Sequence, residues 1–175
     1  FQMKARPWLI KIRRLEESAH KIAEALSLGA TRILMQGGHN PDLPYEYYTE
    51  LIGWIHHTFP AIEIDAFSPS EIEFMGEVSG KSWLEILTEL KSVGLRGLPG
   101  GGGEILDDEI RNRVSPKKIK TDNWLGIMEV AHSLDLTTTA TMVIGFREQV
   151  SHRMNHFQRL RDVQDRSLAK GWRGF

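Results

Sequence analysis

Four apolar runs in this chain each end abruptly in glycines, prolines and polar residues, and this repeated pattern limits the folds open to it. The clusters that follow the runs occupy residues 36–38, 68–69, 99–104 and 145–148. A buried strand that ends in this way brings bare backbone and polar side chains to its carboxyl end, where ligands bind in βα folds. We therefore expect the four strand ends to lie around one site.

The spacing of apolar residues predicts helices and strands in regular alternation. Helices are expected over residues 14–28, 45–59, 70–78, 82–93, 104–114, 121–134 and 150–164, and strands over residues 31–36, 61–67, 94–98 and 137–145. Such alternation is typical of a parallel sheet with right-handed crossovers. Because a closed eight-stranded barrel needs ~250 residues, we expect an α/β fold, a partial (βα) barrel of parallel strands with outer helices. It forms one domain over residues 1–175, truncated at both ends.

Composition narrows the classes of function. The formal net charge of -1 over 175 residues gives no sign of a nucleic-acid or membrane-surface partner. No apolar run approaches the ~20 residues that a bilayer span needs, and no signal peptide is recognisable, so a cytoplasmic location is expected. The absence of cysteine excludes disulfides, thiolate metal sites and cysteine nucleophiles from this chain. The first residue is Phe1, which suggests a fragment; the oligomeric state is not indicated.

The sequence Gln36-Gly37-Gly38 has two readings. Two glycines let a ligand approach the backbone closely, and peptide groups there could bind the charged ends of an amino acid. The same residues could form only a tight turn between a strand and a helix. His39 and Asn40 follow at the same rim. His39 could donate a proton or orient a ligand, although a single histidine often does neither.

The run of four glycines before Glu104 is the second candidate site. Such a run is costly to order and is typical of a flexible linker or of a backbone-lined ligand cradle. Its place between a strand and a helix favours the cradle. It is not a dinucleotide fingerprint, because Ile105 stands where the third glycine belongs. Glu104 is expected in the first helical turn, either as an acceptor for ribose hydroxyls or an ammonium group, or as a charge that complements the helix dipole.

Ser68 and Asp65 are further candidates on the second strand. Ser68 could face the mouth of the barrel or simply form a turn before the next helix. Strand alternation places Glu63 and Asp65 on one face, opposite Ile62 and Ile64. If that face points into the barrel, the carboxylates are functional; otherwise they lie on an exposed edge.

No metal site is predicted in this chain. His152 and His156 have the i, i+4 spacing that can ligate zinc, but no neighbouring Cys or Asp completes a set, so a solvated helix face is expected. Residues 107–109, Asp-Asp-Glu, are interpreted as an exposed helical turn. A Gly-x-Ser-x-Gly elbow is also missing, which leaves a hydrolase triad unsupported.

Taken together, the motifs resemble those of one enzyme family. They are ILMQGGHNPDLP at 33–44, AFSPSEI at 66–72, GLPGGGGEILDDE at 97–109, RVSPKKI at 113–119 and TTTATM at 137–142. In this order they are similar to the radical S-adenosylmethionine (SAM) enzymes of the menaquinone and deazaflavin pathways. The glycine run and Ser-Pro-Lys-Lys-Ile favour the subgroup that forms cyclic dehypoxanthinyl futalosine, over the related aminofutalosine synthases and FO synthases.

The resemblance implies a cofactor and roles for particular positions. It implies that the backbone of Gln36, Gly37 and Gly38 holds the SAM amino group. It also implies that Ser68 and Glu104 lie at the SAM methionine and ribose, and that residues 143–145 lie against adenine. The positions matched in this way are Val143 and Gly145, with Glu148 three residues beyond the glycine. His39 and Asn40 would face substrate, a nucleoside-like small molecule, and Asp65 is added as a catalytic candidate from its place in the strand.

The resemblance also implies chemistry that this chain lacks the residues to perform alone. The family reduces SAM at a 4Fe-4S cluster, and the resulting 5′-deoxyadenosyl radical abstracts hydrogen from the substrate ribose. The cluster is held by a Cys-x-x-x-Cys-x-x-Cys loop, whereas this chain has no cysteine. We therefore expect a central fragment of such an enzyme, inactive by itself.

Two other interpretations remain open. The chain could be a cluster-free module that binds SAM or a nucleoside, since its glycine sites are intact. It could also be an unrelated barrel lyase or aldolase with a phosphate cradle at residues 100–103, although no base or Schiff-base lysine stands at a strand end.

Overall fold

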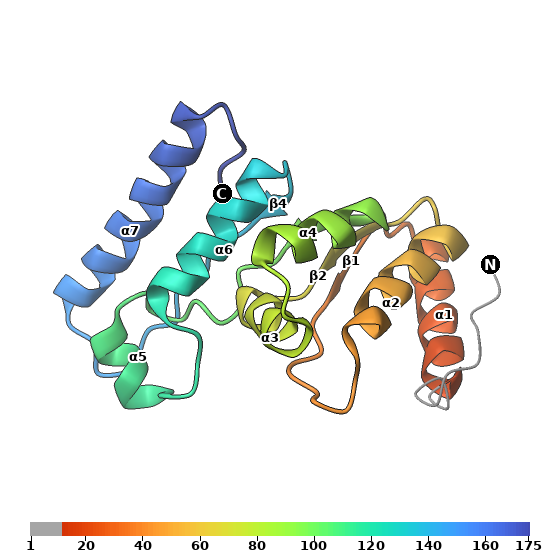
Figure 1. Ribbon diagram of the computed structural model, residues 1–175, viewed down its shortest axis with the longest axis horizontal. Coiled ribbons are helices and arrows are strands. Elements are labelled where there is room, and N and C mark those ends of the chain that lie inside the picture. Colours follow the sequence, from red (N-terminus) through yellow and green to blue (C-terminus); the bar gives the residue numbers. More distant parts are fainter. Residues whose placement is uncertain (1–11) are drawn as a thin grey trace.

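The computed structural model describes residues 12–175, with side chains from Glu16 onward, as a parallel sheet and a set of flanking helices (Figure 1). Residues 1–11 of the expected domain lie outside the described residues. The elements in chain order are α1 Ile12–Ser27, β1 Arg32–Met35, α2 Tyr45–Thr58, β2 Glu63–Ala66, α3 Pro69–Ser79, α4 Trp83–Ser92, β3 Leu95–Leu98, α5 Asp108–Val114, α6 Thr121–Ser133, β4 Thr137–Thr138 and α7 Val150–Ala169.

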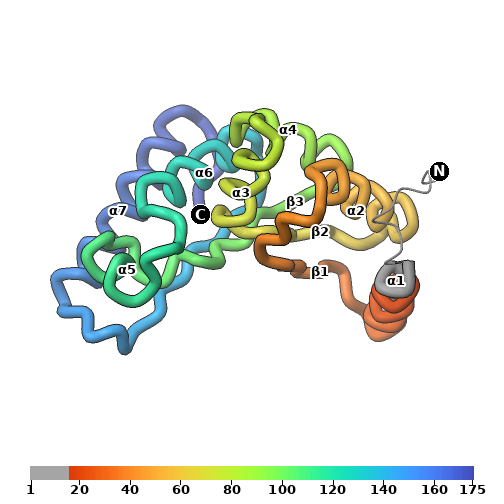
Figure 2. Tube along the Cα trace, turned by 60° about the horizontal axis from the view of Figure 1, so that its bottom comes forward, coloured from red at the N-terminus to blue at the C-terminus, as the bar shows by residue number. Residues whose placement is uncertain are grey.

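The sheet has the topology that the sequence predicts. Its four strands are parallel and run in the order β1-β2-β3-β4, so each strand lies beside the next one in the chain. Figure 2 shows α2, α3 and α4 on the same face of the sheet. Sequential parallel strands with helices outside are the arrangement of a βα barrel. The expected α/β partial barrel is therefore confirmed.

The two faces of the sheet differ in chemistry. The face toward the helices carries the fully buried side chains of Ile64, Leu95 and Leu98, which belong to the hydrophobic core. Each such side chain contributes roughly 1.5–3 kcal/mol when it is buried. On the other face, Arg32 forms ion pairs and Leu34 is 66% exposed. The open face is thus where polar and ligand-facing groups can lie.

The helix boundaries follow local chemistry. Ser82 and Glu85 have the spacing that predicts a capping box, and the box is present, with reciprocal hydrogen bonds at the start of α4. Ser70 and Glu73 have the same spacing and also predict a box, but this prediction is wrong, because α3 already begins at Pro69. Proline suits the first helical position, since its missing N–H has no helical acceptor there.

The last expected strand is much shorter than the sequence predicts. Only Thr137 and Thr138 belong to β4, whereas a strand was expected over 137–145. The threonines that follow bond the glycine run instead: Gly100 N–H donates to Thr139 Oγ1 at 3.0 Å, and Thr141 Oγ1 donates to the Gly100 carbonyl at 3.3 Å. Contacts with this loop therefore override the high strand propensity of the segment.

Two helices also differ from expectation. Asp107 caps α5 by accepting a hydrogen bond from the Glu109 N–H at 3.1 Å, so the helix begins at Asp108 and leaves Glu104 outside it. Helix α7 continues to Ala169, beyond the expected end at Gln164. Within residues 12–175, none of the helices combines the length and the apolar character required to cross a bilayer.

Candidate functional site

The carboxyl ends of the strands meet in one rim. The Gln36 side chain at the end of β1 reaches the Phe67 carbonyl after β2, at 3.5 Å. It also fills the space beside Gly101, where a Cβ would lie 2.5 Å from Gln36 Nε2. Beyond β3, the Glu104 carbonyl accepts a hydrogen bond from the Val143 N–H at 3.0 Å. The four segments expected to surround one site are therefore in contact.

A buried carboxylate holds the first two strand ends together. Glu71, which is 4% exposed, accepts hydrogen bonds from the Gly37 N–H at 2.9 Å and the Gly38 N–H at 3.0 Å. The Ser68 hydroxyl donates to its other oxygen at 2.7 Å. The sequence analysis does not identify Glu71, although Ser68-Pro-Ser-Glu71 has the same capping-box spacing as Ser70 and Glu73.

Strained backbone conformations occur after β2 and β3, at the same rim. Phe67 and Glu104 are two of the four non-glycine residues with positive φ in the described part of the chain, at 68° and 36°. A left-handed conformation costs a non-glycine residue of order 1–3 kcal/mol and tends to occur at functional sites. Each of these residues directly adjoins a polar group of the rim: Phe67 precedes Ser68, and Glu104 carries its own carboxylate.

The glycine run is pinned by side chains rather than flexible. Arg111, 4% exposed, donates to the Gly103 carbonyl at 2.6 Å, the Gly102 carbonyl at 3.0 Å and, through Nε, the Ile119 carbonyl at 3.0 Å. Trp124 Nε1–H donates to the Gly101 carbonyl at 3.1 Å. A planar guanidinium with five N–H groups can bind several carbonyls at once. These contacts favour an ordered, backbone-lined loop over a linker.

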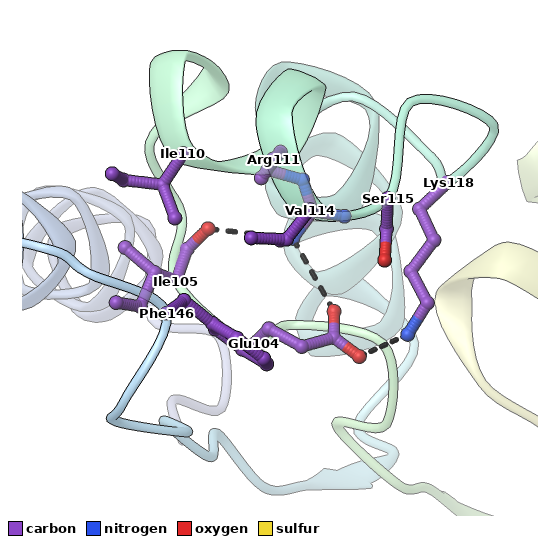
Figure 3. Close-up of a pocket in the computed structure, with 8 residues that line it drawn as sticks. All are labelled: Glu104, Ile105, Ile110, Arg111, Val114, Ser115, Lys118 and Phe146. Atoms are coloured by element: carbon purple, nitrogen blue, oxygen red, sulfur yellow. Dashed lines mark hydrogen bonds and ion pairs between the residues drawn. The ribbon is translucent and has the colours of Figure 1, made fainter.

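Glu104 lies among cations at the edge of a small cavity (Figure 3). One carboxylate oxygen pairs with Lys118, and the other lies 3.6 Å from Arg111 Nη1. That second oxygen is buried and makes no hydrogen bond within the described residues. Burial lowers the pKa of Arg111, and the charge of Glu104 opposes this shift. The cavity has a volume of about 10 Å³, which is too small for a nucleoside.

The side chains of the neighbouring residues His39 and Asn40 have different surroundings. His39 Nε2 lies 3.0 Å from the Ser70 hydroxyl, and its ring stacks on Phe74 with 4.8 Å between the ring centroids. His39 thus stands, exposed, at the edge of the rim beside α3. The Asn40 side chain accepts a hydrogen bond from the Asp42 N–H at 3.0 Å, so it stabilises the turn that leads toward α2.

Asp65 lies on the open face of the sheet, one residue before the end of β2. It pairs with Arg32 Nη1 at 3.1 Å, and Glu63 pairs with the same guanidinium. Both carboxylates therefore share the face opposite Ile64, as the strand alternation predicts. Burial raises the pKa of Asp65, while the charge of Arg32 opposes the shift. A carboxyl group of this kind can hold or accept a proton beside a bound ligand.

We expect Gly97→Ala to destabilise the protein by about 1–3 kcal/mol, because the close packing beside Asp65 leaves no room for a methyl group. The new Cβ would lie 2.2 Å from Asp65 Oδ1 and 2.4 Å from Thr137 Oγ1. Urea unfolding followed by circular dichroism measures the change. The control is Gly53→Ala in α2, where the nearest atom is a Val93 carbon at 3.6 Å and the gain in helix propensity is up to ~1 kcal/mol. Equal effects of the two variants would contradict the prediction.

The segment after β4 orders itself around Glu148. The Gly145 and Phe146 N–H groups donate to its carboxylate, at 3.1 and 2.7 Å to Oε2, and Arg153 forms an ion pair with it. Hydrogen bonds from its own backbone N–H, from Gly145 and from Arg153 lower the pKa of Glu148 to about 2. The Glu148 side chain is 1% exposed, so its carboxylate stabilises this turn. The Val143 side chain, in contrast, is exposed at the rim.

The two histidines of α7 do not share a solvated face, which corrects that expectation. His156 is buried, and its Nδ1 accepts a hydrogen bond from the Leu106 N–H at 3.0 Å. His152 instead forms a group with Asp107 and Glu109, whose potential ligand atoms lie within 4.8 Å of one another. Asp107 already caps α5, and Glu109 pairs with both His152 and an arginine. Each member of this group therefore already has a hydrogen-bond or ion-pair partner.

Comparisons with known proteins agree with the motifs at this rim. The family model of the Radical SAM superfamily matches residues 2–160. A cyclic dehypoxanthine futalosine synthase from Halalkalibacterium halodurans is 48% identical over 145 residues, covering 83% of this chain and 39% of that protein. The Streptomyces coelicolor protein of the same name is 38% identical over 163 residues, covering 93% of this chain and 40% of that protein.

A second group of relatives carries a different name. A 5-amino-6-(D-ribitylamino)uracil–L-tyrosine 4-hydroxyphenyl transferase from Nostoc punctiforme is 37% identical over 170 residues, covering 94% of this chain and 44% of that protein. The chain spans about two fifths of the length of these curated relatives.

Proposed function

The chain belongs to the radical SAM superfamily, and from this premise we propose that it forms the SAM-binding part of a longer cyclic dehypoxanthine futalosine synthase. The observation that carries the proposal is the 48% identity to such a synthase over residues that include the contacting strand ends. The proposed reaction is hydrogen abstraction from the ribose of a nucleoside-like substrate by a 5′-deoxyadenosyl radical, followed by cyclisation.

The rim has groups of the right chemistry for SAM. The carbonyls of Gln36 and Gly37 can accept hydrogen bonds from its ammonium group, and Ser68 is joined to the same glycines through Glu71. Glu104 adjoins the same rim, and its side chain, which is 17% exposed, has acceptor capacity for ribose hydroxyls. The exposed Val143 side chain offers an apolar surface for adenine. When bound, SAM supplies the radical chemistry, while these residues orient it and exclude water.

The residues of this chain do not fit a thiolate-held iron–sulfur cluster, because the sequence contains no cysteine. In our proposal the cluster ligands belong to the part of the longer protein outside these 175 residues. We propose that His39 and Asp65 lie near the substrate. One His39 nitrogen is engaged by Ser70, so the other can face the site, and the raised pKa of Asp65 suits proton transfer. Asn40 stays a weaker candidate because its side chain serves a turn.

Binding to the purified 175-residue chain tests the SAM site directly. We expect isothermal titration calorimetry to show one molecule of S-adenosylhomocysteine or SAM bound per chain. Gly38→Ala is the matched variant, because Gly38 has φ 73° and a side chain there is strained. We expect this variant to bind several-fold more weakly. No binding by the unmodified chain would contradict the proposed site.

The proposed activity requires the longer protein. We expect its reading frame to encode a Cys-x-x-x-Cys-x-x-Cys loop upstream of these 175 residues, and the reconstituted enzyme to release 5′-deoxyadenosine in the presence of dehypoxanthine futalosine. A longer protein without those cysteines would refute the cyclase and leave the alternative of a cluster-free SAM- or nucleoside-binding module. The expected cytoplasmic location stays a prediction.

The similarity to the aminouracil–tyrosine transferases supports a second candidate activity, in the deazaflavin branch of the family. The two activities use different substrates, so release of 5′-deoxyadenosine with tyrosine and 5-amino-6-(D-ribitylamino)uracil, but not with dehypoxanthine futalosine, would favour the transferase. A phosphate cradle at residues 100–103 gains no support, because the Gly100 N–H is already bonded to Thr139.

A further inference from the structure

Glu71 is a buried carboxylate at the rim, 4% exposed, and no role follows for it from the motifs. It accepts hydrogen bonds from two backbone amides after β1 and from the Ser68 hydroxyl after β2. Among the residues that the structure describes, it forms no ion pair. A buried carboxylate without a cation is costly unless hydrogen bonds replace its lost hydration. Three hydrogen bonds from two strand ends therefore hold this carboxylate in place.

These bonds fix the direction of two peptide groups. A trans peptide is planar, with its N–H and C=O pointing in opposite directions. Because the Gly37 and Gly38 N–H groups point at Glu71, the carbonyls of Gln36 and Gly37 point away from it. Two carbonyl oxygens are thereby presented side by side, on glycine-rich backbone that would otherwise adopt many conformations.

We propose that Glu71 is a positioning residue, whose carboxylate aligns the carbonyls of Gln36 and Gly37 to receive the ammonium group of the bound ligand. This inference rests on the proposed function, because it takes the ligand to be SAM. The effect is geometric: the carboxylate acts through the two peptide groups and does not touch the ligand. The aligned carbonyls therefore favour a ligand with an amino-acid end.

Two substitutions separate geometry from charge. In Glu71→Gln, the amide oxygen still accepts from both glycine N–H groups, and the new NH₂ can donate to the Ser68 oxygen. In Glu71→Asp, the charge remains but the side chain is one methylene too short to reach both strand ends. Glu77→Asp is the matched control, because Glu77 lies exposed on the same helix.

Binding of two probes to the 175-residue chain tests the inference. S-adenosylhomocysteine carries the ammonium group, whereas 5′-methylthioadenosine lacks the amino-acid end. We expect Glu71→Asp to weaken binding of S-adenosylhomocysteine by about tenfold or more, which corresponds to one charge-assisted hydrogen bond. Binding of 5′-methylthioadenosine should stay within about twofold, a split that a general loss of structure does not produce. Glu71→Gln and Glu77→Asp should bind both probes like the unmodified chain.

Hydrogen exchange of the ligand-free chain gives a second measurement. The Gly37 and Gly38 amides should exchange faster in Glu71→Asp than in Glu71→Gln. Equal weakening of both probes in Glu71→Asp, or a loss in Glu71→Gln as large as in Glu71→Asp, would overturn the positioning role while leaving the proposed function intact. If the unmodified chain binds neither probe, the proposed site fails and the inference is rejected with it.

Discussion

Replacing Arg111 with methionine is expected to lower the free energy of unfolding by about 3–5 kcal/mol, because several buried carbonyls each lose a donor at a cost of about 1–3 kcal/mol. The guanidinium is 4% exposed and is the shared donor for carbonyls of the glycine run and of Ile119. Methionine matches the volume of the side chain but donates no hydrogen bond. It would leave those carbonyls without their donor, and Glu104 would keep only its ion pair with Lys118.

Two variants make this prediction specific. Arg111→Lys keeps the charge but loses the planar fork, so it should recover only part of the lost stability. Arg113→Met, on the same helix, removes an exposed pair with Glu109 and should cost about 0.5 kcal/mol or less. Urea unfolding of the three variants measures the differences. Similar losses for Arg111→Met and Arg113→Met would show that the buried bonds contribute little.

Periodic patterns predict the elements of this fold well where residues within the element itself determine its structure. The helix that begins after Ser82 and the strand before Gln36 are found where apolar spacing and caps indicate them. The prediction of a strand is wrong after Thr138, because the threonines there and Val143 bond to the loop around Gly100 and Glu104. That competition arises between residues about 40 positions apart, and no local pattern reveals it.

The residues of the candidate site also divide into those that local sequence identifies and those that it does not. The glycines and the alternation of Glu63 and Asp65 can be identified locally, because they depend on the strand to which they belong. Glu71 and Arg111 could not be identified in this way, since both act on backbone groups of other segments. A charged residue in a helix is usually solvated, so burial is the signal that distinguishes these two, and burial follows only from tertiary structure.

Acidification should remove about 3 kcal/mol of stability through one buried histidine, His132. Its ring nitrogens lie 2.9 Å from the Ser167 and Thr138 hydroxyls, which joins α6 to α7 and β4. Burial lowers the pKa of His132 from 6.5 to about 4, with a partial opposing effect from Glu129. Between these two values the unfolded chain binds a proton that the folded protein does not. Stability is therefore complete above pH 6.5, falls as the pH drops toward 4, and loses nothing further through this group below that.

Comparison with a variant isolates this histidine from carboxylates that titrate in the same range. His132→Gln keeps hydrogen-bonding capacity toward both hydroxyls but cannot be protonated, so its free energy of unfolding should fall less between pH 7 and pH 4.5. His20→Gln, on the exposed surface of α1, serves as the control and should retain the full fall. Urea unfolding at a series of pH values provides the measurement. Parallel curves for the unmodified chain and His132→Gln would show that the junction of α6, α7 and β4 tolerates a charged imidazole.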